Sequence, residues 1–282
     1  MSDCPVATIA IPTRDRPKLI KEAIESALAQ TTARFELLVV DNSTDASTEE
    51  TVRAFKDARI RYQRTDACLS VIDCWNLCIQ HSRGRYIHIL GDDDRVAPDF
   101  LRLSLNVLEG HPEIAFTFTH ANKTDEDWKP LRLWGYDFPP AGSISGKFYL
   151  ELTLTHGCCL TLAPTVVMRK SVHDQLGGYR ADIVSNTFDF NFYLRVGESF
   201  SCYFIDQILV DYRLHRAQLA EKHWRSRSRP TGKIATYLEL LALIPRLFRA
   251  WPTARDQAFL QQRLEVLTRG LAELLHRPFP DL

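Results

Sequence analysis

The chain has 282 residues, of which 45% are hydrophobic and 25% are charged, so it can bury a sizeable core. Its 35 Lys and Arg residues balance 35 Asp and Glu residues, which gives no overall field toward nucleic acid, and we expect no nucleic-acid partner. The seven cysteines form no C-x-x-C pair, and no apolar run approaches the roughly 18 residues of a membrane span. We therefore expect a cytoplasmic protein with reduced thiols.

Predicted strands and helices alternate through residues 1–120. Strands are expected at 6–11, 36–40, 59–63, 86–90 and 114–119, and helices at 17–30, 48–56, 69–81 and 98–109. Ser47 and Glu50 have the spacing of a capping box for the helix at 48–56. Such alternation favours parallel strands joined by right-handed crossovers. The predicted fold class is therefore α/β, with a doubly wound, mainly parallel sheet flanked by helices.

Polar side chains follow the ends of these strands: Thr13, Asp41, Asp66, and the acids Asp92, Asp93 and Asp94 in the segment RYIHILGDDDRVAP. Ligands of doubly wound sheets bind beyond the carboxyl ends of the strands. We therefore expect these residues to converge on one crevice. Three adjacent carboxylates repel one another, and oxygen ligands suit Mg²⁺ or Mn²⁺, which indicates a divalent cation. The alternative is a solvated turn before the helix at Pro98.

The second half of the chain is less regular. Residues 121–144 are expected to form a long irregular loop with several aromatic residues, followed by a helix at 147–155 and a strand at 165–168. Residues 188–196 are predicted to form a mainly buried helix with Asp189 near its start. An acid at that place has either a chemical role or a helix-start role. A strand at 208–214 carries Arg213 and His215 at its end.

Residues 217–282 differ in composition from the rest of the chain. The basic segment 222–229 is expected to be a linker or loop, and helices are expected at 233–243 and 253–276, separated near Pro245 and Pro252. Leucines in the last helix recur at spacings of four and three, at positions 260, 264, 267, 271 and 274. This seam is expected to pack on its own domain. A homodimer, or peripheral contact with the inner face of a membrane, is the alternative.

Taken together, these motifs resemble the family 2 glycosyltransferases, which are inverting enzymes of the GT-A fold. The resemblance covers residues 5–216, and the C-terminal helices lie outside it. It is carried by VATIAIPTRDRPKLIKEAIESALAQ, ELLVVDNSTDAS, HSRGRYIHILGDDDRVAPDFL, TFDFNFYLR and YRLH. It implies a GT-A domain at 1–216, with a nucleotide-binding half at about 1–120 and an acceptor-side half at about 121–216. The linker and C-terminal helices then form a second part at 217–282.

The resemblance also implies roles for individual residues. Asp189 matches the catalytic base, although Phe188 stands where the family commonly has Glu. Asp94, Asp92 and His215 match metal ligands for Mn²⁺ or Mg²⁺, and Asp93 is the alternative, because Gly91 stands where the family commonly has its first acid. The positions that match nucleotide-binding residues are Pro12, Thr13, Arg14, Arg16, Asp41, Asp66, Asp92, Asp93 and Arg213.

The implied function is inverting transfer of a sugar from a nucleoside diphosphate sugar, with UDP the favoured nucleotide, to a hydroxyl of a saccharide or lipid-linked acceptor. The implied setting is synthesis of bacterial surface polysaccharide or glycan. One alternative is a nucleotidyltransferase of similar fold, but such enzymes usually carry a glycine-rich loop after the first strand, and PTRDRP has no glycine. The other alternative is a non-catalytic sugar-nucleotide-binding or scaffold protein.

Overall fold

The computed structural model describes residues 4–134, 140–180, 187–215 and 231–276. The elements of the first part are β1 (Ala7–Thr13), α1 (Pro17–Leu28), β2 (Phe35–Asp41), α2 (Ser47–Ala54), β3 (Ile60–Arg64), α3 (Val71–His81), β4 (Tyr86–Ile89), β5 (Arg95–Val96), α4 (Phe100–Gly110) and β6 (Ile114–Thr124). They are followed by β7 (Pro130–Trp134), β8 (Gly142–Ile144), α5 (Gly146–His156), a 3-10 turn (Ala163–Thr165), β9 (Val166–Arg169), α6 (Lys170–Leu176), α7 (Phe188–Gly197), β10 (Ser201–Arg213), α9 (Thr231–Ala250) and α10 (Ala254–His276).

The strands form one sheet in the order β3-β2-β1-β4-β9-β6-β10-β5, with β7 paired to β6 and β8 paired to β10. The pairs β3–β2, β2–β1, β1–β4 and β6–β10 are parallel. Strand β9 runs antiparallel between β4 and β6. The predicted α/β class with helices on the sheet is confirmed. The sheet is mixed rather than mainly parallel, because β9 at its centre and β5, β7 and β8 all pair in antiparallel fashion.

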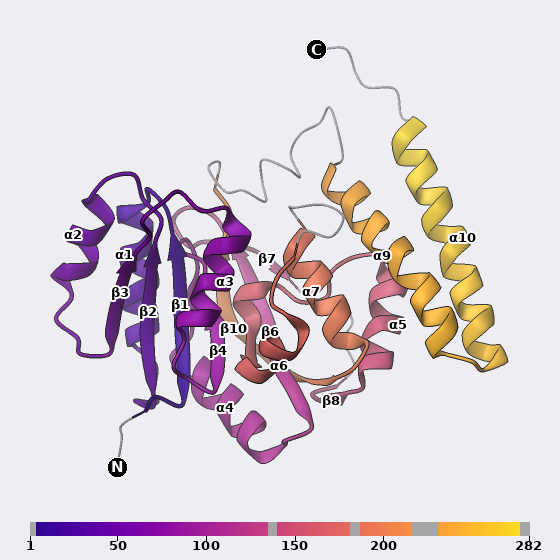
Figure 1. Cartoon of the computed structure of the whole chain (residues 1–282), viewed down its shortest axis with the longest axis horizontal. Helices are drawn as coiled ribbons and strands as arrows, with labels where there is room; N and C mark the ends of the chain where they lie inside the picture. The colour runs from indigo at the N-terminus through magenta and orange to yellow at the C-terminus, as the bar shows by residue number, and fades with distance from the viewer. Residues whose placement is uncertain (1–3, 135–139, 181–186, 216–230, 277–282) are drawn as a thin grey trace.

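Helices cover both faces of the sheet (Figure 1). Strand β1 shows how its residues divide between the faces. Ile9 and Ile11 pack with α1, α2 and α4, whereas Ala10 packs with α3. Successive side chains of a strand point to opposite faces, and both faces of β1 are buried, so the strand reads as a continuous apolar run.

The C-terminal helices α9 and α10 lie outside α5 and α7 (Figure 1). Leu240, Leu243 and Ile244 of α9 are fully buried, and they belong to one apolar cluster with residues of α5 and α7. In α10, Leu260 and Leu267 of the predicted seam are buried in the same cluster. The seam therefore packs on its own chain, as expected. No helix among the described residues is long and apolar enough to cross a membrane.

Three local predictions were wrong. Helix α2 has no capping box, because Ala46 is its N-cap and the Ser47 amide and hydroxyl bond instead to the Asp45 carboxylate. The region 121–144 contains the β6–β7 hairpin and β8, together with residues 135–139 that lie outside the described part. Helix α9 continues through Pro245 to Ala250. A proline inside a helix costs about 3 kcal/mol, which the burial of neighbouring leucines offsets.

A buried histidine in β4 should make the stability of the fold depend on pH. His88 is 1% exposed, and its Nδ1 lies 2.8 Å from the Val166 carbonyl oxygen. Burial lowers its pKa from 6.5 to about 4. Between pH 4 and pH 6.5, about the pKa values of His88 in the native and the unfolded chain, His88 binds a proton in the unfolded chain but not in the native one. Stability should therefore fall as the pH drops from about 6.5 to about 4, by up to about 3 kcal/mol for this group.

Urea unfolding at pH 7 and pH 4.5 tests this expectation. In His88→Asn the amide can still donate to Val166, but it does not titrate. The variant should be less stable than the wild type at pH 7 because of lost packing, and the difference should shrink at pH 4.5. An equal loss of stability in both proteins on acidification would contradict a role for His88.

Candidate active site

The parallel register places the polar ends of β1 and β2 side by side. Thr13 pairs with Asp41, and the Asn42 amide donates a hydrogen bond of 2.9 Å to the Thr13 carbonyl oxygen. Strand β4 is the other neighbour of β1, and the three acids follow its end. The Thr13 hydroxyl donates a bond of 2.8 Å to Asp92 Oδ2. Thr13 is thus in contact with the acidic segment, as the strand ends predicted.

The first two acids share one arginine. One guanidinium nitrogen of Arg16 lies 2.9 Å from Asp92 Oδ1 and 3.1 Å from Asp93 Oδ2. His215, just after β10, approaches from the other end of the chain, and its Nε2 lies 2.8 Å from Asp93 Oδ2. Asp92 and Asp93 are buried, so these cationic and polar partners stabilise carboxylates that would otherwise be costly to bury.

Asp94 is held by the main chain. The Arg213 amide donates a bond of 3.0 Å to Asp94 Oδ1. The second oxygen, Asp94 Oδ2, and Asp93 Oδ1 accept no hydrogen bond from the described residues, and both lie close to Gly91. A β-carbon added to Gly91 would lie 2.8 Å from Asp94 Oδ2 and 2.9 Å from Asp93 Oδ1. A side chain at position 91 would therefore displace the two carboxylates.

The acids are electrostatically strained. Burial, and then the charge of Asp93, raises the pKa of Asp92 to about 6, although Arg16 and Thr13 act in the opposite direction. Burial and the same neighbour raise the pKa of Asp94 well above its ordinary value. Crowded carboxylates of this kind favour the approach of a cation.

Asp41 is fixed by groups from two neighbouring segments. The Tyr62 hydroxyl of β3 donates a bond of 2.6 Å to Asp41 Oδ2, and the Ser43 amide donates one of 2.9 Å to Oδ1. Burial, followed by the bond to Asp41, raises the pKa of Tyr62, which therefore remains a donor at neutral pH. Sequence reasoning missed Tyr62, because a tyrosine in a short strand carries no distinguishing signal.

The remaining predicted nucleotide-binding residues lie at the margin of this group. Pro12 is half-buried within β1, and Arg14 is exposed with its nearest ionic partner, Asp15, 3.5 Å away. Asp66 is exposed beyond the end of β3. The structure thus brings together Thr13, Arg16, the three acids and His215, with Asp41 adjacent, and leaves Arg14 and Asp66 toward solvent.

The Arg213 side chain turns away from the acids. Its guanidinium lies 3.6 Å from the ring centre of Trp128, and Arg95 lies 3.7 Å from the same ring, so two cations sandwich one indole. Glu22 of α1 binds all three groups: it accepts a hydrogen bond from Arg213, pairs with Arg95 at 3.1 Å, and accepts a bond of 3.0 Å from Trp128 Nε1. This arrangement anchors the end of β10, which supplies the amide bound to Asp94.

We expect Trp128 to contribute to stability despite an unfavourable backbone conformation, with φ of 65°. Trp128→Ala keeps that conformation but removes the stacked ring, and should lower the free energy of unfolding by about 2 kcal/mol in urea titrations. Trp128→Phe keeps a ring face without the bond to Glu22 and should lose less. Wild-type stability of Trp128→Ala would contradict a stabilising role for the sandwich.

Asp189 lies in the first turn of α7, half-buried, and its Oδ1 accepts a bond of 2.8 Å from the Phe190 amide. Burial raises its pKa above the ordinary value, and the backbone amides of Phe190 and Asp189 only partly oppose this shift. Its charge contributes to the raised pKa values of the half-buried Cys159 and of the buried Tyr149, Tyr179 and Tyr193. A carboxylate with a raised pKa in such surroundings is suited to accept a proton.

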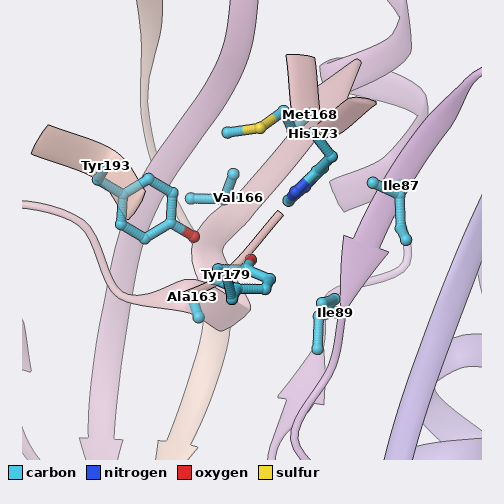
Figure 2. A pocket seen from close by; sticks show the side chains of 8 residues that line it. All are labelled: Ile87, Ile89, Ala163, Val166, Met168, His173, Tyr179 and Tyr193. Atoms are coloured by element: carbon cyan, nitrogen blue, oxygen red, sulfur yellow. The ribbon is translucent and has the colours of Figure 1, made fainter. Parts of the chain in front are cut away.

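A small pocket lies between β4, β9, α6 and α7 (Figure 2). Five of its eight lining residues are apolar, and the polar groups of His173, Tyr179 and Tyr193 face it (Figure 2). None of the predicted site residues lines this pocket. The candidate site is instead the group of polar residues at the carboxyl edge of the sheet. Among the described residues no hydrogen bond or ion pair joins Asp189 to this group.

The metal prediction has a chemical basis but no complete ligand set. Within the described ranges, no group of three or more His, Cys, Asp or Glu side chains could hold a metal ion. One carboxylate oxygen of Asp93 and one of Asp94, both close to Gly91, accept no hydrogen bond in the part of the chain that the structure describes. Mg²⁺ is commonly bound through one or two carboxylates, with substrate phosphates and water completing its shell. The residues present therefore fit a cation that is shared with a phosphorylated ligand.

Known proteins resemble this chain in sequence and in fold. An uncharacterized glycosyltransferase of Rickettsia prowazekii is 26% identical over 222 residues, which are 76% of this chain and 65% of that protein. S. aureus TarS 1-349 in complex with UDP-GlcNAc superposes with a TM-score of 0.65 at 13% identity, covering 96% of this chain and 72% of that one. Mannosyltransferase PcManGT from Pyrobaculum calidifontis, in complex with GDP-Man and Mn²⁺, gives a TM-score of 0.57 at 16% identity, covering 98% and 76%.

The family assignment follows from a match to a family model. That model, Glycosyl transferase family 2, matches residues 8–177, which include β1 from its second residue, all of β2 to β4, and all three acids after β4. Both solved structures share the fold and confirm the predicted α/β architecture. Helices α9 and α10 form the predicted C-terminal helical extension. The chain belongs to glycosyl transferase family 2.

Proposed function

We propose that this family 2 protein is an inverting, metal-dependent glycosyltransferase that uses a nucleoside diphosphate sugar. The observation that carries the proposal is the group of polar residues around Asp92 to Asp94 at the carboxyl edge of the sheet, in a chain that also presents a half-buried Asp189 with a raised pKa. The related folds supply support, because TarS was solved with UDP-GlcNAc and PcManGT with GDP-Man.

The nucleotide would bind across the ends of β1, β2 and β4. In this proposal Asp41 accepts a hydrogen bond from the base and Thr13 lies beside the nucleoside, while Arg16 and Asp92 contact the ribose and the diphosphate. Arg16 can offer its guanidinium to phosphate oxygens, because it is already oriented by Asp92 and Asp93. UDP is the favoured nucleotide, since a carboxylate at position 41 suits a uracil imide.

Asp93 and Asp94 would hold a divalent cation, with His215 at Asp93 as a further ligand and Asp92 beside them. When bound, Mn²⁺ or Mg²⁺ supplies positive charge to the diphosphate oxygens of the donor. The Arg213 amide keeps Asp94 oriented, and Gly91 leaves room for both carboxylates. We assign the Arg213 side chain to anchoring β10 through Glu22 and Trp128, and its backbone to the site.

Asp189 would act as the base. It takes the proton from an acceptor hydroxyl while that oxygen forms a bond to the anomeric carbon, and the bond from this carbon to the diphosphate breaks on the opposite face. The burial that raises the pKa of Asp189 also increases the strength of this carboxylate as a base. The acceptor is proposed to be a saccharide or a lipid-linked saccharide, in the synthesis of a bacterial surface polysaccharide or glycan.

The match to family 2 favours sugar transfer over nucleotidyl transfer, in keeping with the absence of glycine between β1 and α1. A non-catalytic protein could keep the polar residues around Asp92 to Asp94 and bind the nucleotide, but it would not turn over any donor sugar. Contact with a membrane surface, or a dimer through α9 and α10, stays a prediction.

Calorimetric titration with UDP, GDP and dTDP, in the presence of Mn²⁺ or EDTA, tests the proposed donor site. We expect one nucleotide to bind with Mn²⁺ and to lose most of its affinity in EDTA. Donor sugars of that nucleotide are then screened for release of the nucleoside diphosphate. If no nucleotide binds under any condition, the proposal fails. Binding without turnover of any donor would favour the non-catalytic alternative.

A further inference from the structure

Helix α9 contributes a buried carboxylate to the start of α7. Glu239 is 2% exposed. Its Oε1 accepts a bond of 3.2 Å from the Thr187 hydroxyl, and its Oε2 accepts one of 2.9 Å from the Asn191 amide group. These two partners stand on either side of Asp189 in the sequence, so one carboxylate spans the helical turn that carries the proposed base.

The bonds of Glu239 do not have the features of a simple packing contact. Both of its partners are neutral, and among the described residues no cation forms an ion pair with it. Burying a carboxylate with neutral partners is costly, and an apolar residue would pack two helices at lower cost. Thr187 is the N-cap of α7 but does not cap it, because its hydroxyl is directed to Glu239. The helix start is thus held by α9 in place of a local cap.

The contact extends along α7 through a second link. The Asn191 side-chain oxygen accepts a bond of 3.1 Å from Arg195 Nε. Arg195 in turn donates to the carbonyl oxygens of Leu176 and Gly178, at 2.7 and 2.5 Å. Glu239 therefore orients Asn191, and Asn191 is fixed at its other end by an arginine bound to the C-terminal end of α6 and the turn that follows it. A network of this kind restricts the rotation of α7 about its axis.

We propose that Glu239 is a positioning residue for the transfer reaction, and that it holds the first turn of α7 so that Asp189 meets the acceptor hydroxyl. The inference rests on the proposed function of Asp189. It assigns a role in the active site to α9, which lies outside the segment matched by the family model. Glu239 itself contacts neither substrate in this proposal.

The experiment compares Glu239→Gln and Glu239→Ala with Arg246→Ala in the full chain. Arg246 also joins α9 to α7, through an ion pair of 2.9 Å with Glu198 at the opposite end of α7. It therefore controls for a general loosening of the two helices. Two quantities are measured: hydrogen exchange of the amides at 187–193, and turnover of the donor sugar that the nucleotide titrations identify.

We expect faster exchange at 187–193 in both Glu239 variants and unchanged exchange in Arg246→Ala. The kcat should fall roughly 10–100-fold in Glu239→Ala and less in Glu239→Gln, which keeps one acceptor, while the donor KM stays within about twofold. Unchanged exchange at 187–193 in the Glu239 variants would contradict a role for Glu239 in holding the start of α7. Faster exchange together with a wild-type kcat would contradict the positioning role. If Asp189→Asn keeps wild-type turnover, the assignment of the base fails instead. If wild type turns over no donor, the proposed function fails, and the exchange data still decide the contact.

Discussion

Asp189→Asn should reduce the rate of sugar transfer by about 10²–10⁴-fold, the usual contribution of a general base. Asparagine can still accept the hydrogen bond from the Phe190 amide, so α7 should begin in the same way. Nucleotide affinity should stay near wild type, because Asp189 lies outside the group of residues around Asp92 to Asp94. The kcat from steady-state kinetics and the nucleotide Kd from calorimetry give the two readouts.

The pH dependence of kcat provides an independent check. Burial raises the pKa of Asp189, and the base must be deprotonated to act. The rate should therefore fall as the pH decreases through a value above the ordinary 3.8 of an aspartate. Glu198→Gln, at the surface end of the same helix, should keep the wild-type profile. A profile of the same shape in Asp189→Asn would exclude this carboxylate as the titrating base.

Asp94→Asn should abolish binding of the nucleotide with Mn²⁺, with an expected loss of about 100-fold or more in affinity. An amide carries no charge, and its nitrogen would replace Asp94 Oδ2, the oxygen near Gly91 that accepts no hydrogen bond from the described residues. The backbone bond from Arg213 can still be accepted by the amide oxygen, which favours normal folding. Calorimetric titration of the nucleotide with Mn²⁺ and with EDTA measures the effect.

The matched control is Asp99→Asn, five residues along the same segment. Asp99 accepts bonds from the Thr31 hydroxyl and the Arg102 guanidinium and has no contact with the acids. The Asp99→Asn variant should bind the nucleotide as tightly as wild type does. The proposed cation site would be contradicted if Asp94→Asn bound the nucleotide as tightly as wild type does. It would also be contradicted if wild type bound the nucleotide equally well with Mn²⁺ and with EDTA.

The polar edge of the sheet could be predicted because it depends on a rule of topology. Parallel strands end at a common edge, so Thr13 and Asp92 were expected to meet although 79 residues separate them. His215 was expected there through the family resemblance, and it lies at Asp93. The direction of β9 could not be predicted, because its four residues have the same apolar pattern in either orientation.

The supporting residues were missed for a different reason. Glu22 lies among charged residues of an amphipathic helix, where most charges face solvent. Its role depends on the position of Trp128, which donates a hydrogen bond to Glu22. Trp128 lies in the turn of the β6–β7 hairpin, so its position depends on the length and twist of that hairpin. Glu239 is similar, because a single acid in a leucine-rich helix indicates nothing until the neighbouring helix is known. Buried polar partners are properties of the tertiary structure.

The antiparallel orientation of β9 also separates two parts of the molecule that can vary independently. On the β1 side of β4, the edge beyond the acids is made by the ends of parallel strands. On the other side of β4, the edge is made by Ala163–Thr165, the segment that leads into β9. Cys159 lies just before this segment, and the charge of Asp189 contributes to the raised pKa of its thiol. Insertions or substitutions in 157–162 would reshape the surroundings of Asp189 while leaving the register of β1, β2 and β4 intact. Under the proposed function, such changes would alter the acceptor side of the site without a change on the donor side.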